Sequence, residues 1–287
     1  MKKIIRFIVI LASILLISAF LAPFLAQFLD YKFHRIFTRC IMIGVLGWAV
    51  WAYTRADKSN FKGLIVRYGL QWKKKESASL LVKGFFTAFL LMCLLMVVEV
   101  FLGARIIQPN IKSKFLLQIV EYTFAAFIIG FIEEFFFRGM IFNKLRNWSL
   151  SGAFFLTSIF YSLVHFFKAN DLHIEGRPAV ADSFRLMGAL LEPFADPAKL
   201  WPGVVGLTIF GLVLSYSYWR SKSLYAAVGI HAGAVFFLKT DGFLISINEK
   251  MPVFIYGDKN VYTGVLGWIF MGMIGVVMMF LIPKKKG

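Results

Sequence analysis

Cysteine is scarce in this sequence, and no segment of it repeats another. Cys40 and Cys93 are the two cysteines among 287 residues, and both lie within apolar runs. This pattern predicts neither a disulfide framework nor a cysteine-based metal site. Because no internal repeat is apparent, a transporter built from two homologous halves gains no support.

Acidic residues are also few, with 15 against 32 basic residues and a net charge of +17. A charge of this size can indicate nucleic-acid binding, but no basic helix is interleaved with aromatic residues that would stack on bases. The cations lie instead between apolar runs, where they orient a membrane protein relative to the bilayer. We therefore expect the lipid bilayer as a partner and no nucleic acid.

The apolar content is very high, because 59% of the residues are hydrophobic and the mean hydropathy is +0.74. Soluble domains do not have this composition. We predict an all-α fold, a polytopic membrane helix bundle of about eight transmembrane helices with the active site inside the bundle. The expected spans are residues 7–29, 36–53, 79–103, 115–142, 150–168, 201–219, 223–240 and 262–282.

The distribution of charge along the chain predicts its orientation. If the N-terminus is cytoplasmic, the alternating inner segments hold most of the cations with only two acids, Asp57 and Glu76. Both termini are then cytoplasmic, and the basic inner loops suggest the inner membrane of a bacterium. The first run also has the charged start of a signal peptide, but its long core without a small-residue cleavage site favours a retained span.

The fourth run contains the densest group of charges at membrane depth. Glu134 and Arg138 are four residues apart with the acid first, the favourable order for an ion pair on a helix. Glu133 lies about 100° round the helix from Glu134 and has no obvious cationic partner in the sequence. Carboxylates are costly to bury in a membrane, so Glu133 is a candidate general base or acid.

Two histidines in other runs are expected at a similar depth. Glu133 and His165 lie ~23 Å up their helices from the turn near Trp148, and His231 lies ~15 Å past the turn at 220–222. Small residues around His231 allow its helix to approach its neighbours closely. They are Gly229, Ala232, Gly233 and Ala234.

A carboxylate and two imidazoles suit the hydrolysis of an amide. Glu133 can take a proton from water that His165 orients, and His231 can stabilise the oxyanion. The same three side chains can instead bind zinc with a water in the open position, and their spacing does not separate the two cases. The alternative without chemistry is a structural Glu134–Arg138 ion pair with packing histidines. Glu99, near the outer end of the third run, is expected to reach water and has no assigned role.

Three motifs in order resemble the CPBP family of intramembrane proteases, which includes the CAAX prenyl proteases and bacteriocin-processing or self-immunity proteins. The family motif E-E-x-x-x-R corresponds to residues 133–138, and F-x-x-x-H corresponds to Tyr161-x-x-x-His165, with Tyr in place of Phe. H-x-x-x-N corresponds to His231-Ala-Gly-Ala-Val235, where Val replaces Asn.

The resemblance implies that Glu133 and His165 activate a water, while His231 and the family's Asn polarise the scissile carbonyl. Val235 leaves the last role unfilled, and Tyr161 and Ser162 are in range by sequence to replace it. The resemblance covers the catalytic core in 115–240. The three spans and basic interfacial loop in 1–114, and the last span and basic tail in 241–287, are expected from general architecture.

We therefore expect an intramembrane peptidase that acts on a membrane-associated or prenylated peptide or protein. Glu133, His165 and His231 are its predicted catalytic residues, with Glu134, Arg138 and Tyr161 in support. A mechanism without a metal is favoured over one with zinc. The alternative is a non-catalytic or weakly active immunity or scaffold protein, or a small-solute transporter, on the same fold.

Overall fold

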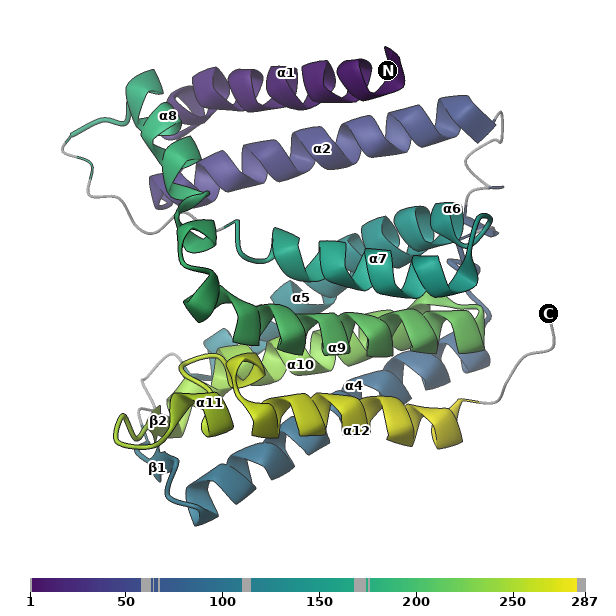
Figure 1. Ribbon diagram of the computed structural model, residues 1–287, viewed down its shortest axis with the longest axis vertical. Coiled ribbons are helices and arrows are strands. Elements are labelled where there is room, and N and C mark those ends of the chain that lie inside the picture. Colours follow the sequence, from purple (N-terminus) through teal and green to yellow (C-terminus); the bar gives the residue numbers. More distant parts are fainter. Residues whose placement is uncertain are drawn as a thin grey trace. The chain divides into compact units, whose positions relative to one another are not determined.

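The computed structural model describes residues 2–57, 63, 65–66, 68–109, 115–167, 174 and 176–282 (Figure 1). Residues 58–62, 64 and 67 of the predicted interfacial loop, and the basic tail at 283–287, lie outside the described residues. The chain divides into two compact units, residues 1–61 with 165–197, and residues 62–164 with 198–287.

The first unit consists of two long helices and a short one. They are α1 (Lys2–Leu25), α2 (Phe33–Asp57) and α8 (Val180–Ala189), the last followed by a 3₁₀ turn, Glu192–Ala195. The three helices pack around an apolar cluster comprising Ala19, Ala22, Phe33, Ile36, Phe37, Leu186 and Leu190. The Ser183 hydroxyl donates to the Ala19 carbonyl over 2.9 Å, and so ties α8 to α1.

The second unit contains the remaining long helices. They are α4 (Lys74–Phe101), α5 (Phe115–Glu134), α7 (Leu150–Val164), α9 (Pro197–Ser221), α10 (Leu224–Thr240) and α12 (Val265–Leu281). A π-helix (Phe135–Phe142) and α6 (Asn143–Leu145) continue α5, and the short α11 (Val253–Tyr256) precedes α12. One small sheet joins β1 (Arg105–Ile107) to β2 (Ile245–Ile247) in antiparallel register (Figure 1).

Helix α10 is the most deeply buried helix of the second unit, and small residues place it there. A Cβ atom on Gly229 would lie 2.2 Å from the Leu81 carbonyl oxygen, and one on Gly233 would lie 2.3 Å from that of Phe85. Backbones this close leave no room for a side chain. The prediction that small residues bring the His231 helix against its neighbour is confirmed, and that neighbour is α4.

Every predicted apolar run corresponds to a helix, so the all-α polytopic bundle is confirmed. Within the part of the chain that the structure describes, four segments are long and apolar enough to cross a bilayer, namely Phe33–Ala52, Lys74–Phe101, Phe115–Leu145 and Pro197–Ser221. Val9–Leu25, Leu150–Val164 and Val265–Leu281 are shorter apolar helices. The chain is thus a multi-pass membrane protein, while the count of eight spans, the orientation of its termini and the three sequence regions stay predictions.

The expectation that Glu99 reaches water is wrong. Glu99 is 1% exposed, and its Oε2 lies 3.0 Å from Nε of Arg105. Arg105 also donates to the Asp258 carbonyl over 3.1 Å. Because the chain turns back into β1 directly after α4, the strand supplies the guanidinium that makes burial of Glu99 tolerable.

Candidate active site

The paired glutamates lie where α5 changes from an α-helix to a π-helix. Glu134 is the last residue of α5, and the π-helix that follows contains Arg138. A π-helix closes its hydrogen bonds between residues i and i+5, and such segments occur frequently at functional sites. The apolar residues of this segment gave no sign of the change in helix type, because the i, i+4 pattern of an α-helix continues through it.

Arg138 is buried completely, and each of its nitrogens has a partner. Its Nη1 lies 2.9 Å from Oε1 of Glu134, and neither side chain is exposed. Nη2 donates to the Gly211 carbonyl over 3.0 Å, and Nε lies 3.4 Å from the Ser215 hydroxyl. The guanidinium carbon lies 4.6 Å from the centre of the Tyr161 ring. The predicted ion pair is therefore confirmed, and it joins the π-helix to α7 and α9.

His231 contacts both glutamates, each through a different ring nitrogen. Nδ1 lies 2.8 Å from Oε1 of Glu134, and Nε2 lies 3.9 Å from Oε2 of Glu133. Gly130 lies next to the imidazole, and a Cβ atom there would be 3.4 Å from Cβ of His231, an ordinary van der Waals contact. The edges of the Tyr161 and Phe210 rings pack against the imidazole at centroid distances of 6.1 and 6.0 Å.

The two glutamates differ sharply in exposure. The Glu134 side chain is 0% exposed and that of His231 is 2%, whereas that of Glu133 is 26% exposed. The Glu134 carboxylate is therefore fixed inside the bundle by Arg138 and His231, whereas the Glu133 side chain is partly exposed, with its Oε2 atom buried next to His231. A carboxylate beside a fixed imidazole can exchange a proton with a water molecule.

His165 stands directly after the last residue of α7 and is partly buried. It belongs to the first unit and the other site residues belong to the second. Its meeting with Glu133 and His231 therefore stays a prediction, as does a zinc site formed by these three. Among the residues that the structure describes, no group of three or more His, Cys, Asp or Glu side chains is arranged to hold a metal ion.

The two residues proposed to replace the family's Asn differ in their surroundings. The Ser162 hydroxyl donates to the Val204 carbonyl over 2.9 Å, away from His231. Tyr161 is 1% exposed and packs against both Arg138 and His231. Tyr161 is thus the better placed of the two, and Val235 lies one helical turn beyond His231.

The contact between His231 and Glu134 was not predicted from the sequence. The two residues are 97 positions apart. The pairing of Glu134 with Arg138 already gave that carboxylate a partner, so the sequence did not call for another. A carboxylate oxygen can accept more than one hydrogen bond. The free acceptor capacity of Glu134 was therefore the one feature of the sequence from which a second partner could have been predicted.

A family model matches the segment that contains this candidate site. Residues 115–237 match the family described as Type II CAAX prenyl endopeptidase Rce1-like, and this segment includes Glu133, Tyr161, His165 and His231. Neither the search of curated proteins nor that of solved structures found a match. The segment is thus similar to the Rce1-like type II CAAX prenyl endopeptidases, which is consistent with the predicted resemblance to the CPBP family.

Proposed function

We propose that this chain is an intramembrane endopeptidase that hydrolyses a peptide bond in a membrane-associated or prenylated substrate. The proposal rests on the Rce1-like segment and on one structural observation. A partly exposed carboxylate, Glu133, lies against the free edge of an imidazole, His231, whose other nitrogen is fixed by Glu134.

Glu133 acts first as the general base. It takes a proton from a water molecule, and the resulting hydroxide attacks the carbonyl carbon of the scissile peptide bond. When the tetrahedral intermediate collapses, the carbon–nitrogen bond breaks and Glu133 returns its proton to the leaving nitrogen. The products are a carboxylic acid and an amine, and the carboxylate of Glu133 is restored. His165 is the candidate to orient the attacking water.

His231 stabilises the oxyanion of the intermediate. The Glu134 carboxylate accepts a hydrogen bond from Nδ1 and so directs Nε2 toward Glu133. Two carboxylates face one guanidinium in this buried cluster, so a protonated imidazole makes it neutral and can donate from Nε2. An oxyanion next to such a fixed donor is stabilised without any rearrangement during the reaction.

Replacement of Glu133 by Gln tests the proposal. We expect the Glu133→Gln variant to insert and fold but to lose cleavage of a fluorogenic peptide in which three residues follow a prenylated cysteine, assayed in lipid vesicles. Glu121→Gln is the matched control, because Glu121 is an exposed carboxylate on the same helix, α5. Cleavage by Glu133→Gln at the wild-type rate would remove Glu133 from the mechanism.

Val235 favours one alternative, a non-catalytic immunity or scaffold protein on the same fold. In that case the wild type has no more activity than Glu133→Gln toward any substrate. Comparison of membrane proteomes from cells that express either form separates the two cases. A peptide that accumulates uncut only with Glu133→Gln supports the peptidase and identifies its substrate.

A further inference from the structure

Several buried oxygen atoms near the active site have no hydrogen-bond partner among the described residues. They include Oε2 of Glu134, Oδ1 of Asn143, and the hydroxyls of Ser158 and Ser217. All four residues are at most 5% exposed. Native proteins leave few such atoms unsatisfied, and ordered water is the usual partner where the protein provides none. The second unit therefore has sites for internal water.

The polar groups that contact Arg138 and Asn143 follow one face of α9, in the direction of its C-terminal end. Gly211 and Ser215 accept hydrogen bonds from Arg138, Tyr218 accepts from the Asn143 amide, and Ser221 ends the series. The ten residues from Gly211 to Ser221 span ~15 Å of helix.

Ser158 adds a hydroxyl to this series. A Cβ atom on Gly211 would lie 3.2 Å from Oγ of Ser158, which places that hydroxyl beside the peptide group that anchors Arg138. Ser217 lies about 200° round α9 from Ser215, so its side chain belongs to the other side of that helix. Buried polar atoms on the Arg138 side thus follow one another from the Glu134–Arg138 pair to Ser221.

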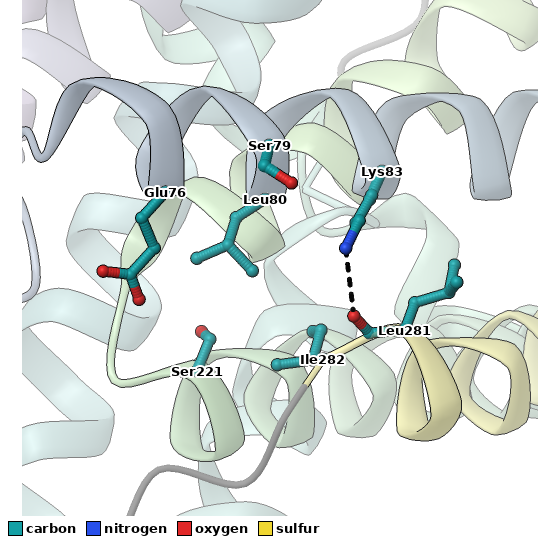
Figure 2. Close-up of a pocket in the computed structure, with 7 residues that line it drawn as sticks. All are labelled: Glu76, Ser79, Leu80, Lys83, Ser221, Leu281 and Ile282. Atoms are coloured by element: carbon teal, nitrogen blue, oxygen red, sulfur yellow. Dashed lines mark hydrogen bonds between the residues drawn. The ribbon is translucent and has the colours of Figure 1, made fainter.

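A cavity lies where this series ends (Figure 2). Its volume is about 120 Å³, and a water molecule needs about 10–15 Å³ by the same measure, so it can hold several. The Lys83 ammonium donates to the Leu281 carbonyl across it, over 3.5 Å. Its lining residues are Glu76, Ser79, Leu80, Lys83, Ser221, Leu281 and Ile282.

We propose that a file of water molecules runs from this cavity along α9 to Arg138 and Glu134, and that it supplies the water consumed in peptide hydrolysis. The supply of water for hydrolysis rests on the proposed function, whereas the presence of the water file does not. A hydrocarbon interior provides no water, and a bound substrate covers the exposed side of Glu133. A second route lets water reach Glu133 while the substrate is in place.

Radiolytic hydroxyl labelling in ¹⁸O-water tests the file in the wild-type protein. Phe142 and Phe37 form a matched pair, because both are 0% exposed. Phe142 packs against Tyr218 on the proposed route, whereas Phe37 belongs to the apolar cluster of the first unit. We expect Phe142 and Tyr218 to be labelled several-fold faster than Phe37. Equal, slow labelling of Phe142 and Phe37 would overturn the file.

Two serine replacements test its role in catalysis. Ser158 and Ser183 are both completely buried, but Ser183 donates to Ala19 away from the route. We expect Ser158→Val to reduce kcat several-fold with an unchanged KM and to reduce labelling of Phe142, while Ser183→Val changes neither. Unchanged kcat and labelling in Ser158→Val would overturn the supply of water by this route.

Failure of this inference can be distinguished from failure of the proposed function. Labelling of Phe142 requires no turnover, so it can be measured equally well in Glu133→Gln. If that variant still cleaves substrate, the mechanism is wrong whatever the labelling shows. If it is inactive and Phe142 is as unreactive as Phe37, the peptidase stands and the water file does not.

Discussion

Loss of the Glu134 charge should be among the most damaging single changes in the second unit. Glu134→Gln keeps the shape of the side chain but leaves the buried guanidinium of Arg138 with only neutral partners. Removing one partner of a buried ion pair costs about 3–5 kcal/mol, because the other charge stays uncompensated. We expect Glu134→Gln and Arg138→Met each to lower the free energy of unfolding by that order.

The double variant should lose much less than the sum of the two single losses. When both charges are removed together, neither is left buried alone, and the coupling energy of contacting residues reaches about 3 kcal/mol. The assay is equilibrium unfolding of the purified protein by SDS in mixed micelles, followed by helical circular dichroism. His231 should then be less well oriented, so the double variant should fold yet cleave substrate slowly.

Asp182 and Arg185 provide the matched control for this cycle. They also form an ion pair, at 3.2 Å on α8, but the Arg185 side chain is 61% exposed. Exposed pairs contribute about 0–1 kcal/mol. If the Glu134–Arg138 cycle gave a coupling energy no larger than that of Asp182–Arg185, the burial argument would be refuted.

Three further outcomes are expected. Val235→Asn should leave peptide cleavage unchanged or make it faster, since it restores a donor one turn after His231; a large loss would show that the geometry differs from that of the family. Gly233→Ala should destabilise the fold by about 1–3 kcal/mol, because its Cβ would meet the Phe85 carbonyl, whereas Gly272→Ala, with no atom within 4 Å, should not; thermal unfolding compares them. Burial raises the pKa of Asp241, so the folded protein holds that proton more tightly than the unfolded chain. Stability should therefore decline as the pH rises from about 4, the unfolded value, and Asp241→Asn should flatten this part of a pH series of melting temperatures.

Local patterns in the sequence were enough to predict the helices and the Glu134–Arg138 pair. Apolar runs of span length determine where helices form in a membrane, because the backbone must satisfy its own hydrogen bonds there. An acid four residues before a base lies on the same helix face whatever else surrounds it. The small residues of α10 likewise predicted close packing, although they did not identify α4 as the partner.

Contacts between distant segments could not be predicted in the same way. Glu99 is buried because Arg105 returns to it through β1, and the three-residue strand left no recognisable pattern in the sequence. The π-helix depends on a shift of hydrogen bonding by one residue, which its apolar side chains do not encode. Both features lie at positions where tertiary packing, and not local preference, decides the conformation.

Adjacent glutamates have different surroundings because a helix separates them by about 100°. This rotation turns Glu134 into the bundle, where Arg138 and His231 hold its carboxylate, and leaves Glu133 partly exposed beside the other nitrogen of His231. In the proposed mechanism, Glu134 alone would hold His231 without supplying a base, and Glu133 alone would supply a base without holding His231. The proposed mechanism therefore needs both glutamates.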